Sequence, residues 1–257
     1  MHPSTTFNSK QNEGDNTSAS EESRQLIHPP RPWEIAVWVV GLVLFIALAV
    51  FIHGHPAPLP LELGVTKMLQ GSHPNPCVYA QLPHMPINNL IDFVSSLNNP
   101  ILSIVSLAIA AIILLIFRLW RQAIFLVVIV GAGTGLFTLL GDIVGRPRPD
   151  VKYGICVHDL IPFHSFPSGH VIHDVVFAGF LFYISIIPPV STWRYRWLLF
   201  PLQGLAIVDI LLIGLSRLYA GEHWLLDVTG AYLTGLLCLF LFIFVYRWTS
   251  KRLVKKS

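Results

Sequence analysis

Apolar residues occur in this chain as long continuous runs that are separated by shorter polar segments. Because a helix rises about 1.5 Å per residue, a run of about 20 residues crosses the hydrocarbon core of a bilayer. Six runs approach or reach this length, at residues 32–52, 101–117, 123–140, 170–187, 197–215 and 228–246. We therefore predict an all-α, polytopic membrane protein, built as a bundle of six transmembrane helices.

The polar segments complete this division of the chain. Residues 1–31 are rich in Ser, Thr, Asn, Gln and Glu, which predicts a disordered tail. Residues 53–86 contain seven prolines and four histidines, which favours a non-helical surface loop. Residues 87–97 have apolar side chains at helical spacing, typical of a short interfacial helix, so 53–100 is predicted to be one outer loop that contains this helix. Residues 247–257 form a basic tail.

Composition narrows the class of protein. The chain is 53% hydrophobic and 12% charged, with a mean hydropathy of +0.62, which is too apolar for an ordinary soluble domain. Its net charge of +3 comes from basic residues in short loops and not from one basic stripe. This distribution argues against nucleic-acid binding and makes the lipid bilayer the expected surroundings.

The basic residues also predict an orientation. With six spans, both termini lie on one side of the membrane, and that side receives most of the basic residues: Arg31, Arg118, Arg121, Arg194, Arg196, Arg247, Lys251, Arg252, Lys255 and Lys256. The opposite side has Lys67 and Lys152 apart from three arginines discussed below. The positive-inside rule therefore places both termini in the cytoplasm, in an integral protein of the plasma membrane.

Residues 216–227 bring charged side chains into a chain that otherwise avoids them, and such groups near a bilayer are commonly functional. On a helix, His223 and Asp227 lie one turn apart, so the carboxylate can accept the imidazole Nδ1–H and leave Nε2 as a free lone pair. Arg217 adds a planar positive group suited to phosphate. The pattern predicts attack of a histidine on a phosphoryl group. The alternative is that Arg217 and Asp227 are interfacial charges and His223 is a helix cap.

Two further segments favour the chemical interpretation. Residues 166–170, Phe-Pro-Ser-Gly-His, supply a hydroxyl, a glycine that permits close backbone approach and a second histidine. Residues 145–150, Gly-Arg-Pro-Arg-Pro-Asp, supply two arginines on a backbone stiffened by proline. In the predicted topology all three segments reach the outer face of the membrane, so we expect a single site there.

In this order the three segments resemble the signature of the type 2 phosphatidic acid phosphatase superfamily, which is K-x6-R-P, then P-S-G-H, then S-R-x5-H-x3-D. The last two elements are complete, at residues 167–170 and 216–227. The first is incomplete because its lysine position falls on Gly141. The resemblance covers roughly residues 88–246 and implies a catalytic core of five transmembrane helices at 101–246.

The resemblance implies a role for each matching residue. His223 is the expected nucleophile, Asp227 orients it, and His170 protonates the leaving alcohol. Five residues are expected to bind the phosphate oxygens: Arg146, Arg148, Ser168, Gly169 and Arg217. Arg146 is expected to replace the lysine that is absent at Gly141. No metal or other cofactor is expected, because these segments offer no carboxylate cluster that could hold Mg²⁺.

A site at the outer interface favours an amphiphilic substrate, whose tail stays in lipid while its phosphate reaches the arginines. Phosphatidic acid, phosphatidylglycerol phosphate and polyprenyl diphosphates all fit this description. Three alternatives remain at the level of sequence. They are a vanadate-dependent haloperoxidase, an anion transporter, and a catalytically impaired member of the family that only binds lipid phosphates, for which Gly141 is the one indication.

Residues outside the signature give smaller predictions. Cys77 and Cys156 both fall in outer loops, which suggests a disulfide, although two independent thiols fit the sequence equally well. Cys238 falls inside the sixth span.

Polar and small residues inside the spans favour helix packing. Asp209, in the fifth span, is expected to hydrogen-bond a neighbouring helix. His173 and Asp174 follow His170 and either extend the site or make such a bond. Three glycines in the third span are expected to allow close helix packing: Gly131, Gly133 and Gly135.

Overall fold

The computed structural model describes residues 30–71, 93–94, 99–159 and 161–254, and this part of the chain contains helices and loops but no strand. The main helices are α2 (Pro32–Gly54), α3 (Pro60–Gln70), α5 (Pro100–Ile116), α6 (Trp120–Val144), α7 (Gly169–Ser185), α8 (Phe200–Tyr219) and α9 (Leu225–Val254). Two short 3₁₀ helices, η2 (Val151–Tyr153) and η3 (Arg196–Leu199), lie in the loops before α7 and α8. The all-α prediction is confirmed for the described residues.

Each predicted span falls on one of these helices. Among the described residues, four helical segments are long and apolar enough to cross a membrane: α2, α6, α8 with the preceding η3, and α9. The apolar helices α5 and α7 have 17 residues each and are shorter than a typical span. The count of six transmembrane helices therefore stays a prediction.

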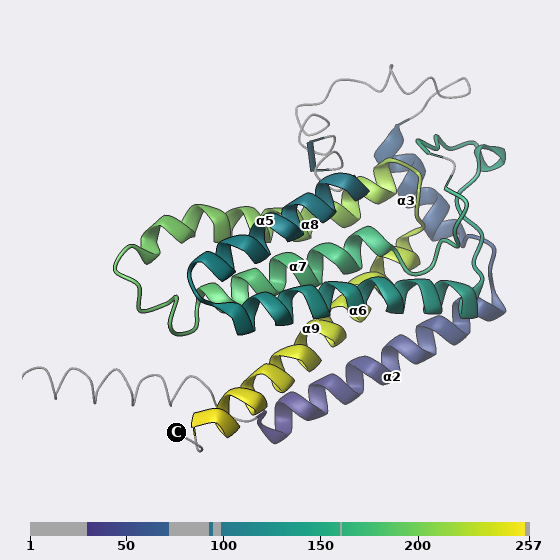
Figure 1. Ribbon diagram of the computed structural model, residues 1–257. Helices are drawn as coiled ribbons and strands as arrows, with labels where there is room; N and C mark the ends of the chain where they lie inside the picture. Colours follow the sequence, from purple (N-terminus) through teal and green to yellow (C-terminus); the bar gives the residue numbers. More distant parts are fainter. Residues whose placement is uncertain (1–29, 72–92, 95–98, 160, 255–257) are drawn as a thin grey trace, which may run out of the picture.

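The helices run alternately in opposite directions, which collects the loops at two ends of the bundle (Figure 1). One end holds α3, the loop between α6 and α7, and the turn between α8 and α9. The other end holds the start of α2, the α5–α6 and α7–α8 connections, and the end of α9. This separation matches the predicted topology, while the assignment of one end to the cytoplasm stays a prediction.

Helix α7 lies at the centre of the bundle, where it packs against α6, α8 and α9. Its inward side chains are almost completely buried: Val171, Ile172, Val175, Val176 and Phe180. Gly133 of α6 faces Ile172 and Val176, and a Cβ added there would lie 3.3 and 3.4 Å from their methyl carbons. The predicted close packing is therefore found at Gly133. It is not found at Gly131 or Gly135, where an added Cβ would meet no atom within 4 Å.

Helix α3 corrects the sequence analysis, because residues 60–70 were predicted to be part of a non-helical loop. Pro60 occupies the first turn, where its missing N–H is not needed, and Glu62 accepts the backbone N–H of Leu59 at 2.9 Å. The prolines that suggested a loop lie at or before the start of this helix, at Pro56, Pro58 and Pro60, or beyond its end. Proline therefore marks the boundary of α3 and not the absence of a helix.

Other predictions fall partly or wholly outside the described residues. These are the tail up to residue 29, Cys77, almost all of the interfacial helix at 87–97, and the end of the C-terminal tail. Helix α9 continues beyond residue 246 to Val254, so the predicted basic tail begins as a helix.

Candidate active site

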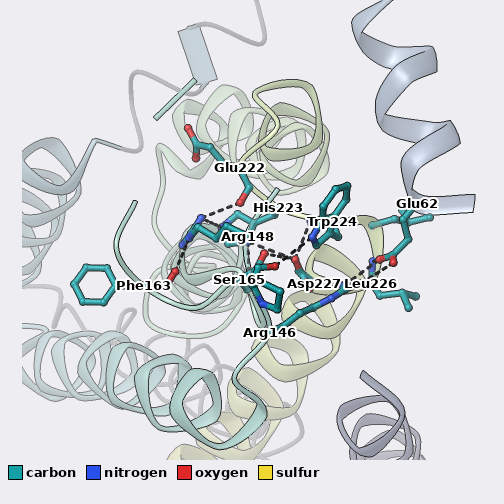
Figure 2. Close-up of polar contacts among 12 residues, drawn as sticks. Glu62, Arg146, Arg148, Phe163, Ser165, Glu222, His223, Trp224, Leu226 and Asp227 are labelled. Carbon is teal, nitrogen blue, oxygen red and sulfur yellow. Dashed lines mark hydrogen bonds and ion pairs between the residues drawn. The ribbon is translucent and has the colours of Figure 1, made fainter. Parts of the chain in front are cut away.

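The three signature segments meet at the end of the bundle that also carries α3 (Figure 1). The first segment follows α6, the second leads into α7 with Ser168 at its N-cap, and the third spans the turn from α8 to α9. The predicted convergence of segments that are far apart in sequence is therefore observed. Figure 2 shows the polar contacts that connect them.

His223 lies at the centre of these contacts and is 1% exposed. Its Nδ1 is 2.7 Å from the backbone carbonyl oxygen of Ser165, and its Nε2 is 3.3 Å from Nη1 of Arg148. A carbonyl can only accept a hydrogen bond, so Nδ1 carries the proton. The lone pair of Nε2 then points toward the guanidinium of Arg148.

The environment of His223 also favours the neutral imidazole. Burial lowers its pKa well below the ordinary value of 6.5, and the positive charge of Arg148 and the nearby His170 lower it further. The hydrogen bond to Ser165 opposes this shift. At neutral pH His223 is therefore uncharged, which is the state in which Nε2 can act as a nucleophile.

The predicted hydrogen bond from His223 to Asp227 is wrong, because Nδ1 lies 4.0 Å from Oδ2 of the carboxylate. Instead, Oδ2 accepts the hydroxyl of Ser165 and, at 2.8 Å, the backbone N–H of Trp224. Asp227 therefore caps the start of α9 and holds Ser165, whose carbonyl in turn holds the imidazole (Figure 2). Its influence on His223 passes through Ser165.

Arg148 is held in place by two backbone carbonyls. Its Nε donates to the oxygen of Phe163 at 2.8 Å, and its Nη1 donates to the oxygen of Glu222 at 2.9 Å (Figure 2). These bonds fix the plane of the guanidinium beside His223, and its half-buried position leaves one side toward solvent. This placement agrees with the expected role in binding phosphate.

Arg217 lies in the last turn of α8 and is 3% exposed. Its Nη1 forms an ion pair with Oε2 of Glu222 at 2.8 Å, and its Nε donates to Oγ of Ser216 at 3.2 Å. Glu222 thus orients Arg217 through its side chain and Arg148 through its backbone. The same carboxylate lowers the net positive charge of the site.

Arg146 differs from its predicted role. It is 1% exposed, and its guanidinium pairs with Glu62 of α3 and with Asp227 at 2.6 Å each. Burial lowers the pKa of Arg146, but these carboxylates raise it by more. Because its donors are directed at two carboxylates, Arg146 is placed to organise the site and not to replace a phosphate-binding lysine.

The lysine position of the signature nevertheless faces the site. At Gly141 an added Cβ would lie 3.5 Å from the carbonyl oxygen of Phe166 and 3.6 Å from Cβ of His164. Both contacts are of ordinary van der Waals length, so this position has room for a side chain that points toward the second segment. In this chain the position has no side chain.

The second segment places three predicted residues at the start of α7. The hydroxyl of Ser168 is buried and has no hydrogen-bond partner among the described residues, which marks it as a group available to a ligand. Gly169 begins the helix, where a Cβ would lie 3.2 Å from the ring of Phe137. His170 follows in the same turn, close enough for its charge to affect His223.

An open cavity of about 300 Å³ adjoins the site and shares Arg148 and Glu222 with it. Its remaining lining consists of Pro149, Val157, Asp159, Ile161, Pro162 and Gly221. At its edge, the ligand atoms of His158, Asp159 and Glu222 lie within 4.8 Å of one another, a spacing that could hold a metal ion. The sequence analysis had found no such cluster, because Glu222 is far in the chain from the adjacent pair His158 and Asp159.

Sequence reasoning also missed Ser165, Glu222 and Glu62. Ser165 orients His223 through its backbone carbonyl, a role that side-chain identity does not reveal. Glu222 lies within the third segment, beside arginines that were predicted to bind phosphate. A carboxylate is unusual in such surroundings, and this could have indicated that it orients the arginines. For Glu62, the signal was a proline followed two residues later by an acid, which is common at the start of a helix.

The cysteines and the deep polar residues can be placed only in part. Cys156 is disulfide-bonded and Cys238 is free, while Cys77, the predicted partner of Cys156, lies outside the described residues. His173 is 3.0 Å from Asp174 of the same helix, measured from Nδ1 to Oδ1. The hydrogen bond predicted for Asp209 stays a prediction.

Comparison with known proteins gives the same family that the signature suggested. The family model described as the PAP2 superfamily matches residues 122–252. Phosphatidylglycerophosphatase B of Bacillus subtilis (strain 168) is 30% identical over 129 residues, which cover 49% of this chain and 58% of that protein. The match thus spans a little more than half the length of this relative.

Two solved structures have a similar fold. The crystal structure of the first transmembrane PAP2 type phosphatidylglycerolphosphate phosphatase from Bacillus subtilis matches with a TM-score of 0.60 and 22% identity, over 80% of this chain and 93% of that chain. The crystal structure of Aquifex aeolicus LpxE matches with a TM-score of 0.52 and 20% identity, over 72% of this chain and 95% of that chain. At these identities the likeness concerns the fold.

Proposed function

This chain belongs to the PAP2 superfamily, and from this premise we propose that it is a membrane phosphatase that hydrolyses a phosphomonoester or diphosphate of an amphiphilic substrate. The observation that carries the proposal is the buried, neutral His223. Its Nδ1–H is fixed by the Ser165 carbonyl and its Nε2 faces Arg148. Burying a polar imidazole costs free energy, so a buried histidine without a function would be less favourable than an apolar residue. An Nε2 lone pair that is oriented beside a guanidinium is suited to attack on phosphorus.

The proposed reaction has two steps. In the first, Nε2 of His223 bonds to phosphorus as the bond from phosphorus to the leaving oxygen breaks, and His170 gives its proton to that oxygen. The leaving oxygen belongs to the alcohol of a phosphomonoester or to the remaining phosphate of a diphosphate. In the second, water attacks the phosphohistidine and gives its proton to His170, while the bond from phosphorus to Nε2 breaks and releases phosphate. The histidines thereby return to their starting states.

Positive charge and hydrogen-bond donors are proposed to stabilise the phosphoryl oxygens during transfer. Arg148 reaches the position next to Nε2, so the Nη1–H that faces the imidazole can donate instead to an incoming phosphoryl oxygen. Arg217, the unpartnered hydroxyl of Ser168 and the backbone N–H of Gly169 are proposed to complete this set. Arg146 is excluded from it by its pairing with Glu62 and Asp227.

We place the active site at the extracytoplasmic face and both termini in the cytoplasm, as the distribution of basic residues favours. There the lipid tail of a substrate can remain in the bilayer. The names of the relatives in Bacillus subtilis make phosphatidylglycerol phosphate the first substrate to test. Phosphatidic acid and polyprenyl diphosphates carry the same chemical group and belong in the same assay.

The chemistry proposed for His223 does not require a metal ion. The cluster of His158, Asp159 and Glu222 makes metal independence worth testing, because a metal ion held there would lie next to Arg148. We expect EDTA to leave turnover unchanged and vanadate to inhibit, since vanadate mimics five-coordinate phosphorus. Loss of turnover in EDTA that Mg²⁺ restores would contradict this part of the proposal.

The deciding experiment measures phosphate release by the purified protein from these three substrate classes, together with trapping of an acid-labile phosphoenzyme. Wild-type protein should form the phosphoenzyme and turn over, and His223→Asn should bind the lipid phosphate but do neither. Binding without turnover in the wild type would indicate the lipid-phosphate-binding alternative, for which Gly141 is the observation in favour. Transport of an anion without hydrolysis would indicate the transporter.

A further inference from the structure

Helix α3 lies outside the part of the chain that matches the family model, yet its first turn reaches the site. Glu62 is 1% exposed. Its Oε1 accepts the backbone N–H of Leu226 at 3.0 Å and Nη1 of Arg146 at 3.1 Å, while its Oε2 lies 2.6 Å from Nη2 of Arg146 (Figure 2). One carboxylate of α3 therefore holds both the loop after α6 and the start of α9.

The polar contacts continue from Arg146 to the imidazole. Nη1 of Arg146 is 2.6 Å from Oδ1 of Asp227, and Oδ2 of Asp227 accepts the hydroxyl of Ser165. The carbonyl of Ser165 accepts Nδ1–H of His223 at 2.7 Å. Every side chain in this series, including Glu62, is at most 1% exposed, so water does not compete for these bonds.

The negative charge of Glu62 helps to fix the orientation of the Arg146 guanidinium. Arg146 is shared by two carboxylates, and its two contacts with Glu62 are bidentate, which fixes the plane of the guanidinium. Without the charge of Glu62, Arg146 would keep a single ionic partner and could rotate about it. Asp227 and Ser165 would then lose the fixed donor that holds them. Small displacements of a reacting group lower the reaction rate strongly, by about 100-fold for a displacement of about 1 Å.

The last turn of α3 is attached to the site as well. Nε2 of Gln70 donates to the carbonyl oxygens of Cys156 at 2.8 Å and Tyr219 at 2.9 Å, and Oε1 of Gln70 accepts the N–H of Cys156 at 2.8 Å. These contacts join α3 to the loop before α7 and to the end of α8. Gly221 lies beside the same carbonyl of Cys156 with a positive φ of 62°, where a side chain would collide with it.

We propose that α3 is part of the framework of the active site and that Glu62 is a positioning residue. It fixes Arg146 and, through Asp227 and Ser165, the ring of His223. The proposal rests on the proposed phosphatase function. Glu62 contacts neither the imidazole nor the adjoining cavity, so it acts on the reaction through Arg146 and through the start of α9.

The test is Glu62→Gln in the full-length protein. Glutamine keeps the shape of the side chain and can still accept the N–H of Leu226, but it removes the charge that pairs with Arg146. We expect kcat per folded molecule to fall about 10- to 100-fold with little change in KM, because the substrate-binding groups are untouched. The folded fraction is measured by thermal unfolding.

Glu34→Gln is the matched control. Glu34 occupies the same position in α2 that Glu62 occupies in α3: it follows a proline at the start of the helix, accepts a backbone N–H, that of Arg31 at 2.7 Å, and pairs with an arginine, Arg247, at 3.3 Å. The start of α2, which carries Glu34, lies at the opposite end of the bundle from the turn between α8 and α9. We expect its kcat to equal that of the wild type.

A second measurement does not depend on turnover. The ¹⁵N signals of the imidazole report the Nδ1–H tautomer and its hydrogen bond, and the signal of His223 is identified by its loss in His223→Asn. We expect Glu62→Gln to shift this signal and Glu34→Gln to leave it unchanged.

The outcomes separate the two proposals. An unshifted His223 signal in Glu62→Gln overturns the positioning role, whatever the activity. So does a kcat per folded molecule equal to that of Glu34→Gln, even if the unfolding temperature falls. A wild-type protein that releases no phosphate refutes the proposed function instead, while the shift of the His223 signal still decides the role of Glu62.

Discussion

His223 donates Nδ1–H to a backbone carbonyl, and this changes what each neighbouring side chain contributes. A carbonyl cannot change its protonation state, so the tautomer of the imidazole is fixed by the fold itself. Asp227 supports this arrangement from a distance by holding the hydroxyl of Ser165 and the backbone N–H of Trp224, just before α9. The two acidic neighbours of the site, Asp227 and Glu222, each hold an arginine in place.

Asp227→Asn should therefore lower kcat by a smaller factor than the same substitution does in an enzyme whose aspartate holds the imidazole directly. In the serine protease triad the corresponding change lowers kcat about 10⁴-fold because the tautomer becomes wrong. Here the carbonyl of Ser165 still selects Nδ1–H, so we expect a loss of about 10- to 100-fold from displaced groups. Steady-state phosphate release by the purified variant measures this. A loss near 10⁴-fold would mean that Asp227 controls the tautomer after all.

The low pKa of His223 predicts how activity and stability change with pH. Nε2 attacks only when neutral, so the acidic limb of kcat/KM should have its midpoint below 6.5, and the need for a protonated His170 should add a basic limb. Below about pH 6.5 the unfolded chain protonates this imidazole and the folded chain does not, so stability should fall as pH falls. Thermal unfolding of the wild type and of His223→Asn between about pH 5 and 8 measures the contribution of this imidazole to the pH dependence of stability.

At the scale of elements, the site depends on how loops are joined to helix ends. The start of α9 is capped by Asp227 from its own first turn and by Glu62 from α3, and both carboxylates lie where the helix dipole favours negative charge. The central helix α7 is fixed by packing against α6 and α9, which sets the position of Ser168 and His170 at its first turn.

Two glycines of α6, Gly131 and Gly133, provide a matched test of this packing. Gly131→Ala should stabilise the protein by about 0.5–1 kcal/mol, because alanine is the better helix former and an added Cβ meets nothing there. Gly133→Ala should gain little or destabilise, since its Cβ would press on Ile172 and Val176. The difference in unfolding temperature between the two variants measures the contact. Equal stabilisation by both would show that α6 and α7 are not closely packed at Gly133.

Sequence patterns were sufficient for elements whose cause is local, and insufficient where the cause lies in distant contacts. Hydrophobic runs predicted the long helices, and the spacing of the signature placed His223, Arg148 and Ser168 at one end of the bundle. The role of Arg146 was misjudged because a free guanidinium and one paired with two carboxylates have the same sequence. Its partner Glu62 lies 84 residues away in a segment whose prolines suggested a loop.

At the scale of the whole molecule, the loops divide into the end that carries the candidate site, called the catalytic end below, and the end where α2 begins and α9 ends. The exposed surface of the helices between these ends is largely apolar, as shown by Val40 of α2, Ile104 of α5 and Leu211 of α8. Such a surface is stable only in contact with lipid. A substrate phosphate of the kind proposed would therefore approach the site from one face of the bilayer.

Single cysteines can test this sidedness. Val151→Cys introduces a thiol at an exposed position of the catalytic end, and Arg194→Cys introduces one in the exposed α7–α8 connection. In intact cells a membrane-impermeant maleimide should label the first and not the second, and lysis should make both reactive. Labelling of Arg194→Cys alone before lysis would show that the protein has the opposite orientation in the membrane.

The bidentate pair between Glu62 and Arg146 has a consequence for the evolution of the family. A buried carboxylate that loses its arginine costs several kcal/mol, so neither residue can change alone without penalty. We therefore expect the two positions to covary among relatives that possess a helix equivalent to α3. Arg146 lies inside the region matched by the family model and Glu62 lies before it, so such covariation would extend the functional unit beyond the recognised domain.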